Sequence, residues 1–265
     1  MIKAIATDMD GTFLNSQSTY DQARFLTVYA ELKRRGIAFI VASGNPVYQL
    51  QKTFAPVKDE LVYVAENGVE LVEGGQDVLV GQIAPAAVTG IVAEIAPIKG
   101  SRIILSGRHQ AYALGKLPAA FRAIAERHYP GVKEVASLAE VGDPIVKIML
   151  DVPGELTQPL MDQINHDYAG ELTAVSSGYG NLDLIVAGMD KAAGLKHYLA
   201  HHQLEPAELM AFGDGQNDLT MLQLAGESYA MANGIAAVKQ VAKYQTRSND
   251  ENGVLVAIEK MLAEN

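Results

Sequence analysis

The sequence contains no cysteine and no tryptophan, and only 6% of its 265 residues are aromatic. The absence of cysteine excludes disulfide bonds and thiolate metal sites, and it fits a reducing cytoplasm. No stretch approaches the roughly 18 consecutive apolar residues that a membrane-spanning helix needs. The first residues also lack the basic and apolar regions of a signal peptide. We therefore expect a cytoplasmic protein without a membrane partner.

Positive charge is scarce as well, since 21 lysines and arginines stand against 31 aspartates and glutamates and give a net charge of −10. A surface with this excess repels anionic polymers, so we do not expect nucleic acid as a partner. The 49% of hydrophobic residues is ordinary for a globular protein, and the length allows one large core or two smaller ones. We expect a monomer or a weak homo-oligomer.

Buried strands and helices alternate at both ends of the chain. Apolar runs predict strands, and apolar residues at helical spacing predict helices between them. The expected strands are 2–7, 37–42, 61–65, 209–212, 228–231 and 243–246, and the expected helices include 20–35, 191–202 and 253–263. Near-continuous apolar strands separated by helices are typical of a parallel sheet with both faces covered. The expected fold class is therefore α/β.

The middle of the chain has a different pattern. A hairpin that turns at Gly74-Gly75 leads into a region, from about residue 82 to 187, where strand-like and helical pieces are mixed. This change indicates an inserted α+β domain. We therefore expect a core made of residues 1–81 and 188–265 and an inserted domain made of residues 82–187.

Two aspartates follow the first strand, in Asp8-Met9-Asp10-Gly11-Thr12. Alternate residues of an extended segment point the same way, so Asp8 and Asp10 can face one site. A cation would relieve their repulsion, and Mg²⁺ takes oxygen ligands. One carboxylate can then attack phosphorus while the other transfers protons. Asp, Gly and Thr are also common turn residues, which is the alternative interpretation.

Two further positions suit a phosphate group. Ser43-Gly44 ends the second predicted strand and offers a hydroxyl and backbone N–H groups at the start of a helix. Lys191 begins another predicted helix, where the helix dipole disfavours a cation. At a phosphate site, Lys191 would supply the positive charge that this acidic chain otherwise lacks. Each position is also common in ordinary turns and on exposed surfaces.

Acid and amide side chains crowd the loop 213–218, Gly-Asp-Gly-Gln-Asn-Asp, after the last long strand. Asp214 would complete a metal site, Asn217 can hydrogen-bond phosphate, and Asp218 can orient Lys191 or begin a helix. The carboxyl ends of parallel strands meet at one edge of a sheet, where ligands bind. The sequence therefore predicts one site assembled from all four segments.

In this order, the four segments resemble the motifs of the haloacid dehalogenase (HAD) superfamily. The segments "ENGVELVEGG" (66–75) and "SNDENGV" (248–254) resemble its Cof-type, sugar-phosphatase branch. The resemblance covers nearly the whole chain and implies a Rossmann-like core with an inserted cap that selects the substrate. Two positions depart from the pattern: Asn45 stands where many Cof-type relatives have arginine, and Met9 replaces the common leucine.

The resemblance also implies the roles of the site residues. The catalytic pair would be the nucleophile Asp8 and the general acid/base Asp10, with Thr12 and Asp218 as supporting residues. Mg²⁺ would be held by Asp8, the backbone carbonyl of Asp10, and Asp214. Phosphate would be bound by Ser43, Gly44, Lys191 and Asn217. In the cap, the loop that includes Ser177, Tyr179 and Asn181 would contact the substrate, although the same residues also make an ordinary hairpin turn.

These residues predict a Mg²⁺-dependent phosphatase that hydrolyses small phosphorylated metabolites, such as sugar phosphates, through an aspartyl-phosphate. One alternative is a phosphomutase of hexose phosphates on the same fold. A non-enzymatic module that accepts phosphate on aspartate is a second alternative, but the Asp-x-Asp spacing and the insertion of about 100 residues count against it.

The histidines show no metal-ligand spacing. His197 and His201, four positions apart, have no third ligand nearby, and we interpret them as solvated.

Overall fold

The computed structural model describes residues 1–178 and 181–264, and the chain divides into two compact units. The first unit comprises Met1–Ser43, Asp59–Val78 and Asp190–Asn265, and the second comprises Gly44–Lys58 and Leu79–Met189. Residues 82–187, the predicted insertion, lie within the second unit together with the short segment 44–58. The assignment of core and cap roles to these parts stays a prediction.

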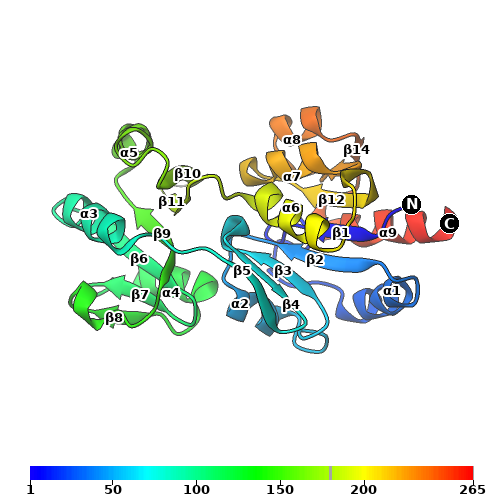
Figure 1. The fold of residues 1–265 in the computed structure, drawn as a ribbon, viewed down its shortest axis with the longest axis horizontal. Coiled ribbons are helices and arrows are strands. Elements are labelled where there is room, and N and C mark those ends of the chain that lie inside the picture. The colour runs from blue at the N-terminus through cyan, green and yellow to red at the C-terminus, as the bar shows by residue number, and fades with distance from the viewer. Residues whose placement is uncertain (179–180, 265) are drawn as a thin grey trace. The chain divides into compact units, whose positions relative to one another are not determined.

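The sheet of the first unit has the strand order β14-β13-β12-β1-β2-β3-β4-β5 (Figure 1). The strands from β14 to β3 pair in parallel, and β4 turns back antiparallel to β3. The bounds are β1 Ala4–Thr7, β2 Ala38–Ala42, β3 Val62–Ala65, β4 Glu70–Glu73, β5 Gln76–Val80, β12 Leu209–Gly213, β13 Glu227–Ala230 and β14 Tyr244–Gln245. The α/β fold class and the alternating strands and helices are confirmed, and the predicted hairpin at Gly74-Gly75 forms β4 and β5 at one edge of the sheet.

Helices cover both faces of this sheet, which explains why every residue of β1 and β12 is buried. Helices α6, α7 and α8 pack on one face, and α1 packs with α9 on the other (Figure 1). The bounds are α1 Gln22–Arg34, α6 Lys191–His201, α7 Leu219–Leu224, α8 Ala236–Val241 and α9 Gly253–Glu264. Asp21 and Asp190 cap α1 and α6, because their side chains accept backbone N–H bonds from the first turn.

The second unit contains a sheet of order β10-β11-β9-β6-β7-β8, in which only the β7–β8 pair is parallel among the described pairs. The strands are β6 Arg102–Gly107, β7 Ala111–Leu114, β8 Lys133–Val135, β9 Ile145–Asp151, β10 Leu172–Gly178 and β11 Asn181–Val186. Helices α3 (Pro85–Ile95) and α5 (Gly154–Asp167) bury one face, and α4 (Ala119–His128) packs on the other. Helix α2 (Val47–Thr53) also belongs to this unit.

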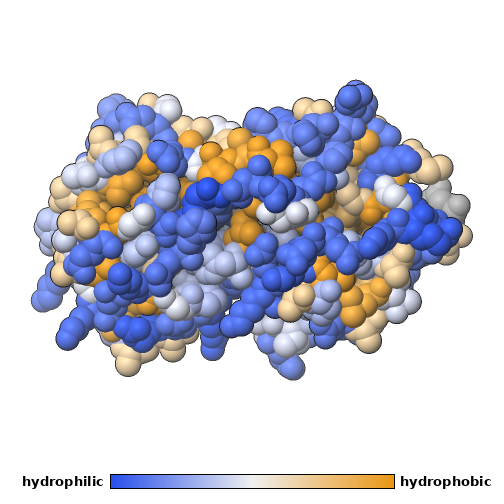
Figure 2. Space-filling view, turned by 60° about the horizontal axis from the view of Figure 1, so that its bottom comes forward, coloured by the Kyte–Doolittle hydropathy of each residue, from blue (hydrophilic) through white to orange (hydrophobic). Residues whose placement is uncertain are grey.

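Strands β7 and β8 were not predicted, because they are only four and three residues long and carry no alternation that distinguishes them from loops. Within residues 1–178 and 181–264, no helix combines the length and apolar character needed to cross a bilayer. On the face shown in Figure 2, hydrophilic residues separate the hydrophobic ones into patches.

Candidate active site

The site begins where two neighbouring parallel strands end together. In the register of β1 with β12, Thr7 lies opposite Phe212, so Asp8 and the loop 213–218 leave the sheet side by side. The backbone N–H of Asp8 donates to the Phe212 carbonyl at 3.1 Å, which continues the ladder by one residue. The backbone of Asp8 is therefore held at the end of the sheet, and the residue is largely buried.

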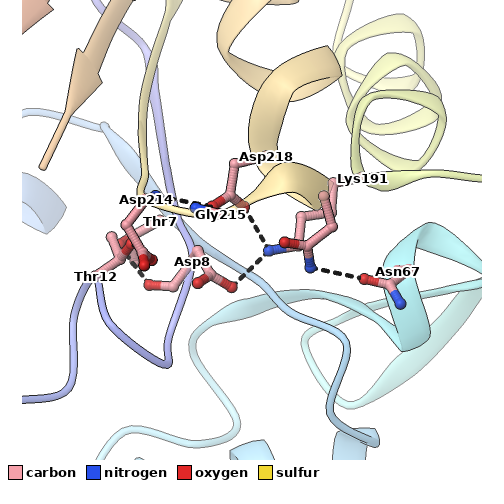
Figure 3. A network of polar contacts seen from close by, with 9 residues as sticks. Thr7, Asp8, Thr12, Asn67, Lys191, Asp214, Gly215 and Asp218 are labelled. Carbon is pink, nitrogen blue, oxygen red and sulfur yellow. Dashed lines mark hydrogen bonds and ion pairs between the residues drawn. The ribbon is translucent and has the colours of Figure 1, made fainter. Parts of the chain in front are cut away.

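Gly11 allows the turn after β1 to approach this loop closely. Its φ of +79° lies in the region that favours glycine, and a Cβ at this position would stand 2.5 Å from Asp214 Oδ2. The turn also holds Asp214 directly, because the Thr12 hydroxyl donates to Asp214 Oδ1 at 2.7 Å (Figure 3). Thr12 is thus a supporting residue for the Asp214 carboxylate.

Lys191 joins the two loops from the first turn of α6. Its ammonium donates to Asp8 Oδ1 at 2.5 Å and to Asp218 Oδ1 at 2.7 Å (Figure 3). The Lys191 side chain has no exposed surface. A charge placed unfavourably at a helix start is therefore compensated by two carboxylates rather than by solvent.

Asp218 fixes the loop that carries Asp214. Its Oδ2 accepts the backbone N–H groups of Asp214 at 2.9 Å and Gly215 at 2.8 Å, while its Oδ1 is used by Lys191. Gly213 makes room for this side chain, since a Cβ there would lie 2.4 Å from the Asp218 Cβ. Both oxygens of Asp218 are thus occupied by donors, and its role is to position other groups.

Burial and neighbouring charges shift the pKa values of Asp8, Asp214 and Lys191. Burial raises the pKa of Asp8 well above its usual value; Lys191 opposes this shift, and Asp218 and Asp214 add to it. Burial also raises the pKa of Asp214. For Lys191 burial alone would lower the pKa, but the charges of Asp218 and Asp8 outweigh it and raise the pKa, so the ammonium is retained. The carboxylates, and not the lysine, need a further cation.

Three carboxylates and one ammonium leave two negative charges when all are ionised, and a divalent cation would balance them. The ligand oxygens of Asp8, Asp214 and Asp218 lie within 4.8 Å of one another. Within residues 1–178 and 181–264, both oxygens of Asp218 accept hydrogen bonds, whereas Asp8 and Asp214 each accept one through Oδ1 and leave Oδ2 for a ligand. An all-oxygen donor set of this kind fits a hard divalent ion.

Asp10 and Asn217 lie at the solvent-facing side of the site, where both side chains are exposed. The Asp10 charge contributes to the raised pKa of Asp214, so its carboxylate lies close to that residue. The Asn217 amide donates to Asn67 Oδ1 at 3.2 Å (Figure 3). The backbone N–H of Asn67 in turn donates to the Ser43 carbonyl at 3.0 Å. The buried Ser43 and exposed Asn217 are thereby joined through one residue.

We did not predict Asn67 as part of the site, although Glu66-Asn67-Gly68 follows β3 at the same sheet edge, which is the signal that would have pointed to it. Gly68 has φ of +98°, and a Cβ there would lie 1.9 Å from the Asp190 carbonyl oxygen. This close approach seats the start of α6, and with it Lys191, against the end of β3.

The remaining predicted residues belong to the second unit. Gly44 follows Ser43 directly, and its carbonyl accepts a hydrogen bond of 2.5 Å from Lys147 Nζ. Asn45 is buried, and its Oδ1 lies 3.4 Å from His128 Nδ1. Ser177 lies in β10, and Asn181 begins β11, where it pairs with Gly178. Tyr179 lies outside the described residues.

The chain is similar to known proteins over nearly its whole length. Residues 5–258 match the family model of haloacid dehalogenase-like hydrolases. The chain is 39% identical to the 5-amino-6-(5-phospho-D-ribitylamino)uracil phosphatase YbjI of Escherichia coli, over 98% of this chain and 96% of that protein.

Solved structures show the same fold over nearly the full length. SMU.1108c of Streptococcus mutans superposes with a TM-score of 0.94 at 36% identity, covering 99% of this chain and 100% of the other. The subclass IIB sugar phosphatase BT4131, at 20% identity, has the same fold with a TM-score of 0.83 over 98% of both chains. The chain therefore belongs to the haloacid dehalogenase-like hydrolases and is a phosphomonoester hydrolase of this superfamily.

Proposed function

We propose that this chain hydrolyses small phosphorylated metabolites with the help of Mg²⁺, through a phosphoryl group carried transiently on Asp8. The observation that supports it is the contact of Lys191 with both Asp8 and Asp218 beside the Asp214 carboxylate. This arrangement orients one buried carboxylate as a nucleophile and surrounds it with charges suited to a phosphate ester. We further propose that the protein acts in the cytoplasm, as a monomer or a weak homo-oligomer.

The chemistry assigned to the protein residues proceeds in two steps. In the first, a carboxylate oxygen of Asp8 bonds to phosphorus, the ester P–O bond breaks, and Asp10 gives a proton to the leaving oxygen. In the second, Asp10 takes a proton from water, the water oxygen bonds to phosphorus, and the Asp8–phosphorus bond breaks. Lys191 holds Asp8 in position, and Ser43, Gly44 and Asn217 bind the phosphoryl oxygens. Mg²⁺ held by Asp8, Asp214 and the Asp10 carbonyl would neutralise phosphate charge.

Phosphate release from p-nitrophenyl phosphate tests this mechanism. We expect activity that requires Mg²⁺, is abolished by chelation and returns when Mg²⁺ is added back. Asp8→Asn should abolish it, and Asp10→Asn should lower it about 10²–10⁴-fold, the usual contribution of a general acid/base. Activity retained by Asp8→Asn would overturn the proposal. A hexose 1-phosphate should give free phosphate without its 6-phosphate isomer, which separates hydrolysis from a mutase reaction.

For the substrate, we propose a phosphate ester of a sugar or a sugar alcohol. The 39% identical relative is named for a substrate with a phosphate on a D-ribityl chain, and BT4131 is named as a sugar phosphatase. The ribityl substrate, hexose phosphates and phosphoserine should be compared by kcat/KM under the same conditions. A preference for phosphoserine over all sugar and polyol phosphates would contradict this assignment.

A further inference from the structure

A second group of metal-ligating side chains lies in the first unit, apart from the carboxylates described above. Glu73 ends β4, His201 ends α6, and His202 is the residue that caps α6. One ligand atom from each of the three lies within 4.8 Å of the other two. This group could not be predicted from the sequence, because Glu73 and His202 are 129 positions apart. His201 is exposed, as its interpretation as solvated implies, but Glu73 and His202 were not predicted to lie near it.

We propose that Glu73, His201 and His202 bind a borderline divalent metal ion, with Zn²⁺ as the representative ligand. Two imidazoles and one carboxylate form a donor set that suits Zn²⁺ and related transition-metal ions. Mg²⁺ prefers oxygen ligands, so the two clusters in this chain differ in the ions they select. The three side chains would leave a fourth position of a tetrahedral ion to water.

The geometry is close to what the ion requires. His202 Nε2 lies 2.9 Å from Glu73 Oε2. Bonds of about 2.0–2.1 Å to a tetrahedral zinc ion place its ligand atoms about 3.3 Å apart. The His202 and Glu73 side chains are 35% and 30% exposed, so small rotations can admit the ion. The Tyr198 ring lies 4.4 Å from the His202 ring, centroid to centroid, and limits how far that imidazole can turn.

The local field also favours a cation. The site lies at the carboxyl end of α6, where the helix dipole presents partial negative charge. The Glu73 carboxylate adds a negative charge beside the His202 imidazole. A bound ion would connect β4 to the end of the helix whose first residue is Lys191.

Zinc binding to the untagged full-length protein tests the proposal. A chromogenic zinc chelator should be competed against the protein in excess Mg²⁺, which occupies the carboxylate site. We expect one Zn²⁺ per chain, retained in Mg²⁺. His201→Ala and Glu73→Gln should each weaken zinc binding at least tenfold. His201 is exposed, so its replacement should leave the fold intact.

Two controls identify the site. His197→Ala removes an exposed histidine of the same helix and should bind zinc as the wild type does. Asp8→Asn should also keep the zinc, because Asp8 is not one of its ligands. The proposal is overturned if His201→Ala and Glu73→Gln bind zinc with wild-type affinity, or if Asp8→Asn abolishes binding. Co²⁺ offers an independent measurement, since its visible spectrum should change with His201→Ala and not with His197→Ala.

Discussion

Lys191 donates a hydrogen bond of 2.7 Å to Asp218 in a position where neither side chain has any exposed surface. A buried ion pair contributes little net stability, but breaking one by removing a single partner leaves an uncompensated charge. Asp8, the third member, is also buried and shares the same ammonium. The stability of the first unit therefore depends on the groups that the proposed reaction uses.

Lys191→Met should accordingly destabilise the protein by about 3–5 kcal/mol, because Asp8 and Asp218 lose their common cation. It should also abolish phosphatase activity. Urea denaturation and p-nitrophenyl phosphate hydrolysis measure the two effects. Lys196→Met is the matched control, since Lys196 is exposed on the same helix, and its change should stay within about 0.5 kcal/mol. Equal stabilities for the two variants would show that the buried pair does not support the fold.

Gly11→Ala separates a backbone effect from a contact with the site. Gly11 and Gly36 both have positive φ, +79° and +66°. A Cβ at Gly36 meets nothing within 4 Å, whereas one at Gly11 meets the Asp214 carboxylate. Gly36→Ala should therefore lower the free energy of unfolding by about 1–2 kcal/mol, because alanine disfavours the left-handed conformation. It should keep full activity.

Gly11→Ala should cost more than Gly36→Ala and should also lower kcat/KM, because Asp214 must move away from the added methyl group. Urea midpoints and steady-state kinetics of both variants decide this. If Gly11→Ala matched Gly36→Ala in both stability and activity, the close approach of Gly11 to Asp214 would have no functional role.

Most of the first unit could be predicted from sequence because its strands are continuous apolar runs. Their ends also located Asp8 and Asp214, since parallel strands place their carboxyl ends at one edge. The short strands β7 and β8 could not be predicted, because β7 forms by pairing with β6 and β8, and β8 by pairing with β7. The hydrogen bond between Asn67 and Asn217 could not be predicted either, because it joins residues 150 positions apart.

The complete burial of Lys191 could not be predicted from the sequence either. A lysine at a helix start is usually exposed, and only the tertiary structure shows that two carboxylates enclose it. The burial of Lys147 could not be predicted either, because it lies within the otherwise apolar strand β9. Its side chain is 2% exposed, and no local signal distinguishes it from a surface lysine.

Lys147 should position the loop that follows β2. Its ammonium donates to the Gly44 carbonyl at 2.5 Å and lies 5.4 Å from the centre of the Tyr129 ring. A hydrogen bond to a charged group contributes about 1.5–3 kcal/mol. Lys147→Met should therefore lower kcat/KM about 10–100-fold, by loosening the backbone whose N–H groups we assign to phosphate binding.

The matched control for Lys147→Met is Lys133→Met, an exposed lysine of the same unit on β8. It should leave kcat/KM unchanged. Thermal denaturation of both variants shows whether Lys147→Met still folds at the assay temperature. A folded Lys147→Met protein with wild-type kcat/KM would exclude the positioning role.

The pair Arg24–Glu259 predicts a pH dependence of stability away from the site. Arg24 Nε and Nη2 donate to the two Glu259 oxygens at 2.7 and 2.6 Å and connect α1 to α9. The hydrogen bonds from Arg24 lower the pKa of Glu259 in the folded protein. A lowered folded pKa contributes stability that is present above the unfolded value, about 4.3, and is lost as the pH falls through the folded value.

Glu259→Gln should therefore cost about 0.2–1 kcal/mol at pH 7, the range for partly exposed ion pairs, and the difference from wild type should shrink as the solution is acidified below the ordinary glutamate pKa. Urea denaturation at a series of pH values measures it. Glu264→Gln is the control on the same helix, because Glu264 lies 3.8 Å from Lys260 in an exposed pair and should change stability little at any pH. A Glu259→Gln difference that stayed constant across the series would mean that the pair does not titrate with folding.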